Sequence, residues 1–507
     1  MTSDYGRDMY RQMMELYEKV ERLTAALEEE RKSHREEVAA KDAQIAELKE
    51  ENVHLREQVT LLQTEVVRLK EVVASQSEEI SRLKSNDSNN SNNSSNPPST
   101  DQKGAKKANE YNSRKKTNKK RGGQLGHKGQ TLTKRTAEEL IAAGKCRHNV
   151  IICGDPASGK YTTKYMIDVS IEPEITEYRI YKGASAQDVP CSDVFYGPKV
   201  KALALELYGV GVVSLKRIQD IISGITDGVI NVAGATLYEF FRKFAERAKK
   251  DLQNIENHLM NGTVAYTDAT VITINGEQGH IRNISNDGAV RYYAMEKKNL
   301  ESLRKIELLM KFAGIFVHDH ETTMYKFGTG HGECNVHILR YLLKNTEDSS
   351  NSWSGKLSDL LLEMKECRDK AVENGKKSLT AEELASFFTR YEEILELGYV
   401  ENLSTAPKWV KKEEFSLLNR LCKYKENHLL FLKNFGVAFS NNMSERDLRK
   451  CKNRQKVAGG FRSLEGCEMY ADILSIIETA KRQKRNPFYV ILSLFQSPNP
   501  ALDFCQG

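Results

Sequence analysis

Hydrophobic residues recur every seven positions near the start of the chain and predict one long helix over residues 10–84. One seam of this helix is made of leucines and the other mainly of β-branched residues: Leu48, Leu55, Leu62, Leu69 and Leu83, interleaved with Ile45, Val59, Val66, Val73 and Ile80. This pattern favours a parallel two-stranded coiled coil, in which a buried Asn52 fixes the register at some cost in stability. An earlier seam, from Met13 to Leu27, is displaced by four residues, which is a stutter. We therefore expect residues 1–84 to make the protein a homodimer or a higher oligomer.

A linker and a basic arm follow this helix. Residues 85–100 are almost entirely Ser, Asn and Pro, which cannot build a core and predict a flexible linker. Residues 101–135 carry twelve Lys or Arg against two acids, so we expect the arm to contact DNA phosphates whatever the base sequence. The candidate DNA-binding residues of the arm are Lys115, Lys116, Lys119, Lys120, Arg121 and Lys128. The alternative is a tail that only increases solubility.

Alternating apolar and polar positions predict a strand over residues 264–274, with Asp268 in its middle. A carboxylate buried there must be paired, protonated or bound to a metal ion, because burying it alone is costly. The elements predicted next are strands at 280–285 and 289–296, a helix at 300–312, and a strand at 314–319 that ends on Asp319. Three strands, a helix and a strand tipped by an aspartate are typical of the start of a ribonuclease-H-like sheet.

The rest of the chain divides by composition. The regions expected are a small one at 136–195, a helical one at 196–259, a core in two parts at 260–345 and 431–507, and an all-helical insertion at 346–430. Two interpretations of 196–259 remain open: a helix-turn-helix that binds DNA, with Thr236, Tyr238, Arg242 and Lys243 facing outward, or a plain helical subdomain. The fold class is therefore an α/β core with an all-α insertion, preceded by a coiled coil and a helical DNA-binding region.

Cysteine and histidine residues offer two further candidate sites. Cys146, His148, Cys153 and Cys191 could bind zinc, but they contain no Cys-x-x-Cys pair, so we expect this region not to depend on zinc. One helix is expected to carry His331, Cys334, His337 and Arg340. Either Cys334 and His337 bind zinc, or this helix packs behind the active site. A glycine-rich loop at 154–160 is not a nucleotide site, because Tyr161 replaces the Ser or Thr that binds magnesium and the continuation is strand-like.

Composition limits the class of protein. The chain has 507 residues, 39% of them hydrophobic, and a formal net charge of +6. It shows no stretch of 18 apolar residues and no signal-peptide pattern, so we expect no membrane association. The nine cysteines are an odd number and show no disulfide framework, so we expect reduced thiols. Reduced thiols are typical of the cytoplasm, and we expect a nucleoid-associated protein of the bacterial cytoplasm.

Five motifs carry a resemblance to a known family. They are KKRGGQLGHKG at 119–129, AYTDAT at 265–270, GIFVHDHETTMYKF at 314–327, GECNVHILRYL at 332–342 and NNMSERDLRKCKNRQKVAGGFRS at 441–463. In this order they resemble transposases of the insertion sequence 66 family. The resemblance implies a DDE triad of Asp268, Asp319 and Glu445, all three catalytic and all three ligands of magnesium. Double-stranded DNA, as transposon ends and as target, would be the substrate, and small accessory transposition proteins are potential partners.

The chemistry expected of such a triad is metal-dependent cleavage and strand transfer. Carboxylates are the ligands preferred by Mg²⁺, and two ions (Mn²⁺ can substitute) would stabilise the attacking and leaving oxygens of the phosphodiester. A cationic cluster after Glu445 is expected to hold DNA: Arg446, Arg449, Lys450, Lys452, Arg454, Lys456 and Arg462. Ala269 and the pair His320-Glu321 depart from the family pattern. The alternative function is a catalytically degenerate, dimeric DNA-binding regulator derived from a transposase.

Four other acids are either alternatives to Glu445 or expected to be dispensable. Glu321 and Glu333 are the alternatives for the third ligand if Glu445 is wrong. Asp287 and Asp447 are expected to be dispensable neighbours.

Overall fold

The structure, a computed structural model, describes residues 3–87, 133–153, 155–159, 161–182, 192–496, 502 and 504. It forms two units, residues 1–88 and residues 89–507. Most of the linker and the basic arm, including its six candidate DNA-binding residues, lie outside the described residues.

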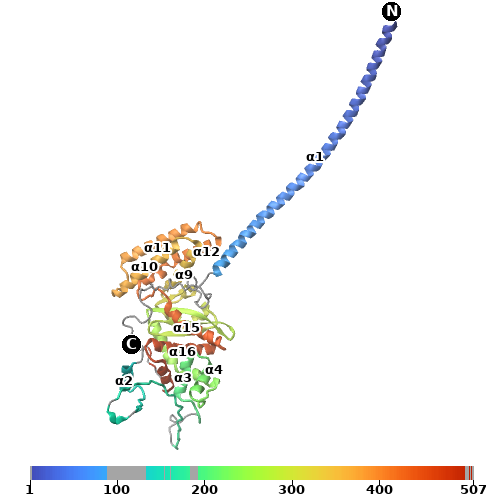
Figure 1. Cartoon of the computed structure of the whole chain (residues 1–507). Coiled ribbons are helices and arrows are strands. Elements are labelled where there is room, and N and C mark those ends of the chain that lie inside the picture. Colours follow the sequence, from blue (N-terminus) through green and yellow to red (C-terminus); the bar gives the residue numbers. More distant parts are fainter. Residues whose placement is uncertain are drawn as a thin grey trace. The chain divides into compact units, whose positions relative to one another are not determined.

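The first unit is a single helix, α1 (Ser3–Asp87), of 85 residues (Figure 1). This helix confirms the long helix predicted from the heptads. No proline interrupts it. The seam leucines are exposed to solvent, with Leu62 65% and Leu69 48% exposed. A helix of this length gains little stability from its own side chains, so burial of the seam against another helix is the expected source of stability.

Charges beside the seam favour a second, parallel copy as the partner. Acidic residues flank one side of the seam and basic residues lie five positions later on the other: Glu51 and Arg56, Glu65 and Lys70, Glu79 and Lys84. In a parallel, in-register pair each glutamate faces the basic residue of the other chain, whereas an antiparallel pair would bring like charges together.

The second unit contains a five-stranded mixed sheet. Its strands are β1 (Val264–Ile274), β2 (Glu277–Ser285), β3 (Val290–Met295), β4 (Ile315–His318) and β5 (Gly330–Glu333), in the order β3-β2-β1-β4-β5. Strands β1, β2 and β3 pair antiparallel, while β4 pairs parallel with both β1 and β5. The predicted single helix over 300–312 is wrong: it is two short helices, α7 (Leu300–Arg304) and α8 (Glu307–Lys311), because Ile306 adopts an extended conformation between them.

Two hydrophobic clusters cover the two faces of the sheet, since neighbouring strand residues point to opposite sides. Ala265 and Phe316 belong to one cluster and their neighbours Tyr266 and Val317 to the other. The first cluster is built with α3 (Pro198–Gly209), α4 (Leu215–Ile225), α5 (Gly234–Arg247), α6 (Lys249–Met260), α15 (Asn442–Ala458), α16 (Leu464–Arg482) and α17 (Pro487–Gln496). The second is built with α9 (Asn335–Ser349), α10 (Trp353–Glu373), α11 (Ala381–Asn402), α12 (Lys408–Lys423) and α14 (Leu430–Lys433), with α13 (Lys425–His428) between the last two. Figure 1 shows α10, α11 and α12 gathered together and α15 and α16 apart from them.

The region before α3 has little regular structure in its described residues. It contains α2 (Lys134–Ala142) and a short 3₁₀ turn, η3 (Pro156–Ser158). The strand-like pattern after Tyr161 does not form a strand, and residues 161–182 contain no helix either. Residues 161–182 therefore offer no helix N-terminus to the loop at 154–160.

A fragment of residues 1–90 should be a helical, parallel, in-register dimer, and Asn52→Val should raise its melting temperature because a buried amide is replaced by an apolar side chain. Gln76 lies at a seam position, so Gln76→Cys should form a disulfide between two chains of the fragment under oxidising conditions. Sedimentation analysis would measure the mass. A monomer at micromolar concentration, or a Gln76→Cys protein that does not cross-link, would contradict this assembly.

Candidate active site

Strand register places Asp268 and Asp319 next to each other. Tyr266 on β1 is paired with Val317 on β4. Asp268 lies two residues further along β1 and Asp319 two residues after Val317, directly after β4 ends, so they lie next to each other at the same face of the sheet. This is the face covered by α9 and the helices that follow it.

Asp268 is strongly affected by this neighbour. Burial and the charge of Asp319 raise the pKa of Asp268 to about 6. The Ala269 N–H donates to its Oδ1 at 2.7 Å and, with the nearby cations Lys298 and Arg282, acts in the opposite direction. The carboxylate is therefore held where an added positive charge, such as a metal ion, would lower its pKa again.

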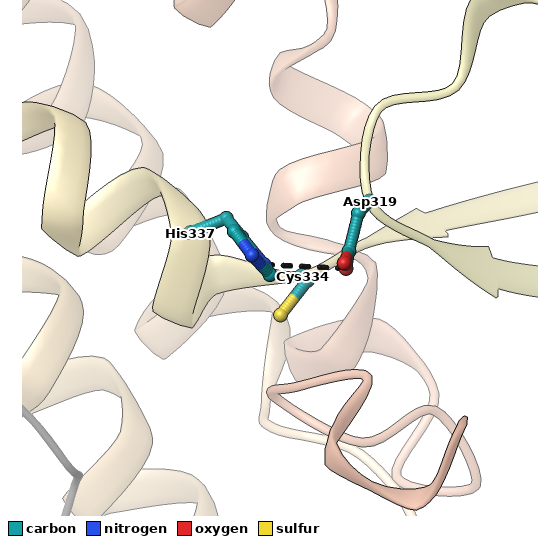
Figure 2. Close-up of side chains that lie close together, drawn as sticks. All are labelled: Asp319, Cys334 and His337. Carbon is teal, nitrogen blue, oxygen red and sulfur yellow. Dashed lines mark ion pairs between the residues drawn. The ribbon is translucent and has the colours of Figure 1, made fainter. Parts of the chain in front are cut away.

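Asp319 contacts two residues from the start of α9, Cys334 and His337 (Figure 2). His337 Nδ1 lies 3.3 Å from Asp319 Oδ1. Burial acts to raise the pKa of Asp319, but the contact with His337 outweighs it and lowers that pKa. Burial likewise acts to lower the pKa of His337, but Asp319 and Cys334 outweigh it and raise that pKa to about 11.

Glu445 reaches the same histidine from the other side. It lies in the first turn of α15, and its Oε1 is 4.0 Å from His337 Nε2. One imidazole ring thus lies between Asp319 and Glu445, while Asp268 interacts with Asp319. The structure thus places Asp319 and Glu445 beside His337, and Asp268 next to Asp319.

Helix α15 is fixed along β1 at both of its ends by amide side chains. At its start, Asn441 Nδ2 donates to the Thr267 carbonyl at 3.0 Å. Near its end, Gln455 accepts from the Thr273 N–H at 2.8 Å and donates to the Thr273 hydroxyl at 2.9 Å. Because Thr267 and Thr273 lie on either side of Asp268, these bonds set the position of Glu445 relative to that aspartate.

A third amide, Asn283 on β2, links the same two elements. It lies opposite Asp268 in the sheet and its Oδ1 accepts from the Asp268 N–H at 3.1 Å. Its Nδ2 donates to Ser444 Oγ and Asp447 Oδ2, each at 3.1 Å. Ser444 and Asp447 flank Glu445, so this fully buried side chain joins the strand of the first acid to the helix of the third.

The other acids near the site are engaged in structural pairs. Glu321 accepts from Arg282 with both carboxylate oxygens at 2.7 Å, and it lies 3.2 Å from Lys298. Asp447 accepts from Arg482 with both oxygens, at 2.7 and 2.8 Å. Asp447 is thus engaged in a buried ion pair, which the sequence did not predict; that it is dispensable for activity stays a prediction.

Glu333 is buried within a polar network. It accepts from His320 at 2.7 Å and from Arg420 at 2.8 Å, and also pairs with Tyr325. His320 has a positive φ of 39°, which is strained for a histidine, and the bond to Glu333 helps to hold it there. The departures His320 and Glu321 thus have structural roles, and neither Glu321 nor Glu333 has a free carboxylate to serve as the third ligand.

Buried polar atoms without hydrogen-bond partners show that the site suits a cation. Asp319 Oδ1, His337 Nδ1 and Asn441 Oδ1 are buried and make no hydrogen bond; the 3.3 Å approach of the first two is close but not aligned as one. Such atoms are costly unless a water or an ion satisfies them. Oxygen atoms of Asp268, Asp319 and Glu445 are suitable ligands for magnesium.

Residues 193–469 match the family model described as Transposase IS66 family. The match spans more than half of the 507 residues and contains Asp268, Asp319 and Glu445. The chain belongs to the IS66 transposase family. Residues 35–133 match a second model, described only as a family of unknown function, and no curated protein matches the chain.

The exposed cations of this IS66-family chain are fewer than the sequence predicted. On α15, Arg446, Arg449, Lys452 and Lys456 are exposed, as is Arg462 after the helix. Lys450, however, pairs with Glu478 at 2.9 Å, and the buried Arg454 donates to the Val213 carbonyl at 3.1 Å. Lys450 thereby joins α15 to α16, and Arg454 joins it to the segment between α3 and α4, so these two side chains are not freely exposed members of the predicted DNA-binding cluster.

The structure also describes residues from two other candidate sets, those of the possible helix-turn-helix and of the possible zinc region. Arg242 on α5 is bonded to Glu239 and Glu246, which occupies its donors within the helix. In the described residues, the one group of potential metal ligands within reach of each other is Asp319, Cys334 and His337. Cys146, His148 and Cys153 are exposed and do not form such a group, and Cys191 is outside the described residues.

The helix expected to carry His331, Cys334, His337 and Arg340 begins later than predicted. His331 lies in β5 and Cys334 precedes the first turn of α9. Cys334 and His337 consequently lie beside Asp319 in the site and not behind it. No helix in the described parts of the chain has the length and apolar character needed to cross a membrane.

The substitution Asn283→Asp should lower the melting temperature and reduce DNA cleavage more than DNA binding. Loss of the two Nδ2 donors puts a carboxylate against Asp447, at a cost of about 1–3 kcal/mol for the unsatisfied buried groups. Asn286→Asp is the matched control, because Asn286 Oδ1 only accepts hydrogen bonds, from Gly288 and Ala289, and a carboxylate can do the same. Wild-type melting and cleavage in Asn283→Asp would show that this amide does not position the site.

Proposed function

We propose that the protein is a DDE transposase that binds the ends of an insertion sequence, cleaves one strand by hydrolysis and joins the freed 3′-hydroxyl to target DNA. The observation that supports this most is that Asp319 and Glu445 both approach His337 and Asp268 lies next to Asp319, in a chain of the IS66 transposase family. The strand order β3-β2-β1-β4-β5 further supports a ribonuclease-H-like core.

Asp268, Asp319 and Glu445 are proposed to hold Mg²⁺, with Mn²⁺ as a substitute. When bound, the metal supplies Lewis-acid stabilisation of the charge on the attacking and leaving oxygens of the phosphodiester. Asn283, Asn441 and Gln455 keep the three acids in place with neutral groups, so they add no charge that would compete for the ion. His337 holds Asp319 and Glu445 close together in the absence of an ion.

Exposed arginines of α15 are proposed to contact the scissile DNA. Arg446 lies one residue after Glu445 and Arg449 one turn further along, both exposed. Arginine binds phosphate with two parallel hydrogen bonds, which fixes the backbone as well as neutralising it. The basic arm is proposed to add sequence-independent affinity and the coiled coil to bring two copies together on two DNA ends.

Asp268→Asn, Asp319→Asn and Glu445→Gln should each reduce metal-dependent nicking of an end-bearing substrate by at least about a hundredfold, since metal stabilisation is worth several kcal/mol. DNA binding, measured by fluorescence anisotropy, should remain. Combining two of these substitutions should add little to the loss from one, because the three act as a unit. Asp287→Asn is the control and should cut normally, since Asp287 is exposed in the β2–β3 turn.

Two results would contradict this assignment. If the wild-type protein binds the ends tightly but cuts nothing with Mg²⁺ or Mn²⁺, the regulator hypothesis is correct. If Glu445→Gln cuts normally, Glu445 is not the third ligand.

Replacing the six basic candidates of the arm by glutamine should weaken binding to DNA of any sequence. Each phosphate contact contributes about 0.9 to the slope of log affinity against log salt, so the slope should fall by up to about 5. Deletion of residues 88–100, which carry no charge, is the control and should leave the slope unchanged. An equal slope in the glutamine variant would show that the arm does not engage phosphates.

A further inference from the structure

We propose that Asp319, Cys334 and His337 form a binding site for Zn²⁺, and that zinc bound there removes Asp319 from the magnesium site and stops cleavage. The inhibition rests on the proposed function, whereas the binding of zinc does not. The site lies where β4 ends and α9 begins (Figure 2).

The donor atoms already have a geometry close to that of a zinc site. One carboxylate oxygen, the thiol sulfur and one imidazole nitrogen all lie within 4.8 Å of one another. His337 Nδ1 and Asp319 Oδ1 are 3.3 Å apart. Two ligands that bind zinc at about 2.0–2.1 Å in a tetrahedral arrangement are separated by about 3.3 Å. The separation of the imidazole nitrogen and the carboxylate oxygen therefore matches that of two ligands of one zinc ion.

The chemistry of the three donors selects zinc over magnesium. Thiolate and imidazole are soft or intermediate ligands, which bind zinc in proteins, while magnesium prefers oxygen ligands alone. Asp319 suits either ion, so it belongs to both candidate sites. A three-ligand zinc site leaves a fourth position open to water or to a DNA oxygen.

The surroundings fit a metal-bound thiolate and imidazole. The Asn441 N–H donates to Cys334 Sγ at 3.2 Å, a bond that stabilises negative charge on sulfur. His337 Nδ1 is buried without a hydrogen bond. If Nδ1 binds the metal, the ring proton remains on Nε2, the nitrogen that faces Glu445 at 4.0 Å. Binding releases the thiol proton of Cys334 and the Nδ1 proton of the His337 imidazolium to solvent and changes no oxidation state.

Access to the ion is from the side of the acid. Cys334 and His337 are 1% and 8% exposed, whereas the side chain of Asp319 is 23% exposed. An ion would thus arrive from the same opening as catalytic magnesium. Zinc should act as a competitive inhibitor with respect to magnesium.

Cobalt substitution in the full-length protein tests binding without reference to activity. The background should be the triple variant Cys146→Ser, Cys153→Ser and Cys191→Ser, so that the cysteines of the zinc-module region predicted from the sequence cannot contribute. Co²⁺ should bind one ion per chain and give a thiolate-to-cobalt charge-transfer band, which Zn²⁺ abolishes by displacement. Absence of the band in this background overturns the proposal. This outcome does not depend on whether variants with substitutions in the site itself fold.

Adding Cys334→Ser to this background should remove the band and weaken Zn²⁺ binding by at least about a hundredfold, since a direct ligand matters at least as much as its outer-shell partners. Cys367→Ser is the matched control, because Cys367 lies in α10, outside the metal-ligand group. Thermal unfolding verifies that each variant is folded. A band that survives Cys334→Ser overturns the assignment.

Inhibition is measured separately, as nicking with increasing Zn²⁺ at two Mg²⁺ concentrations. Zinc should inhibit the triple variant, less so at high Mg²⁺, and inhibit the Cys334→Ser version at least tenfold more weakly. Equal inhibition of both would contradict a regulatory role for the site. If no variant cuts DNA with magnesium, the proposed function fails, but the cobalt result still decides whether zinc binds.

Discussion

The placement of two carboxylates side by side in a buried sheet face is the constraint on which the rest of the core depends. Asp268 and Asp319 repel each other and lose hydration, which is why the pKa of Asp268 rises to about 6. The fold compensates with a cation beside Asp319, His337, which also faces Glu445 and whose pKa is raised to about 11. An arrangement that is stable only with such a compensating charge is suited to exchange it for a metal ion.

Uncharged amide side chains hold the acids in position without adding charge to the site. Asn283, Asn441 and Gln455 connect β1 and β2 to α15 through hydrogen bonds of 2.8–3.1 Å. Lysine or arginine in their place would neutralise the acids permanently, and further acids would add repulsion. The true ion pairs, Arg282 with Glu321 and Arg482 with Asp447, satisfy acids beside the triad and leave the triad itself available.

The sequence predicted local helices and strands better than the contacts between side chains that are far apart in the chain. The strand at 264–274 matches β1 residue for residue, and alternation alone showed that Asp268 needed a partner. The long helix followed from heptads, which are repeated many times. By contrast, the roles of Asn283, Gln455 and His337 depend on contacts across tens to hundreds of residues, and no local period reports such contacts. Arg454 illustrates the same limit: its charge suggested DNA, but its burial over Tyr208, 4.4 Å from the ring, depends on a helix some 240 positions away.

The helical insertion between Asp319 and Glu445 contributes to the site and does not merely separate two acids. Arg420 on α12 and His428 on α13 meet Glu333 on β5, at 2.8 and 3.4 Å. Glu333 in turn bonds His320, the strained residue directly after Asp319. Removing Arg420 would leave a buried carboxylate without its main counter-charge, and the turn that orients Asp319 would lose its support. The insertion therefore stabilises the backbone conformation that presents the second aspartate, through contacts of α12 and α13 that meet at Glu333.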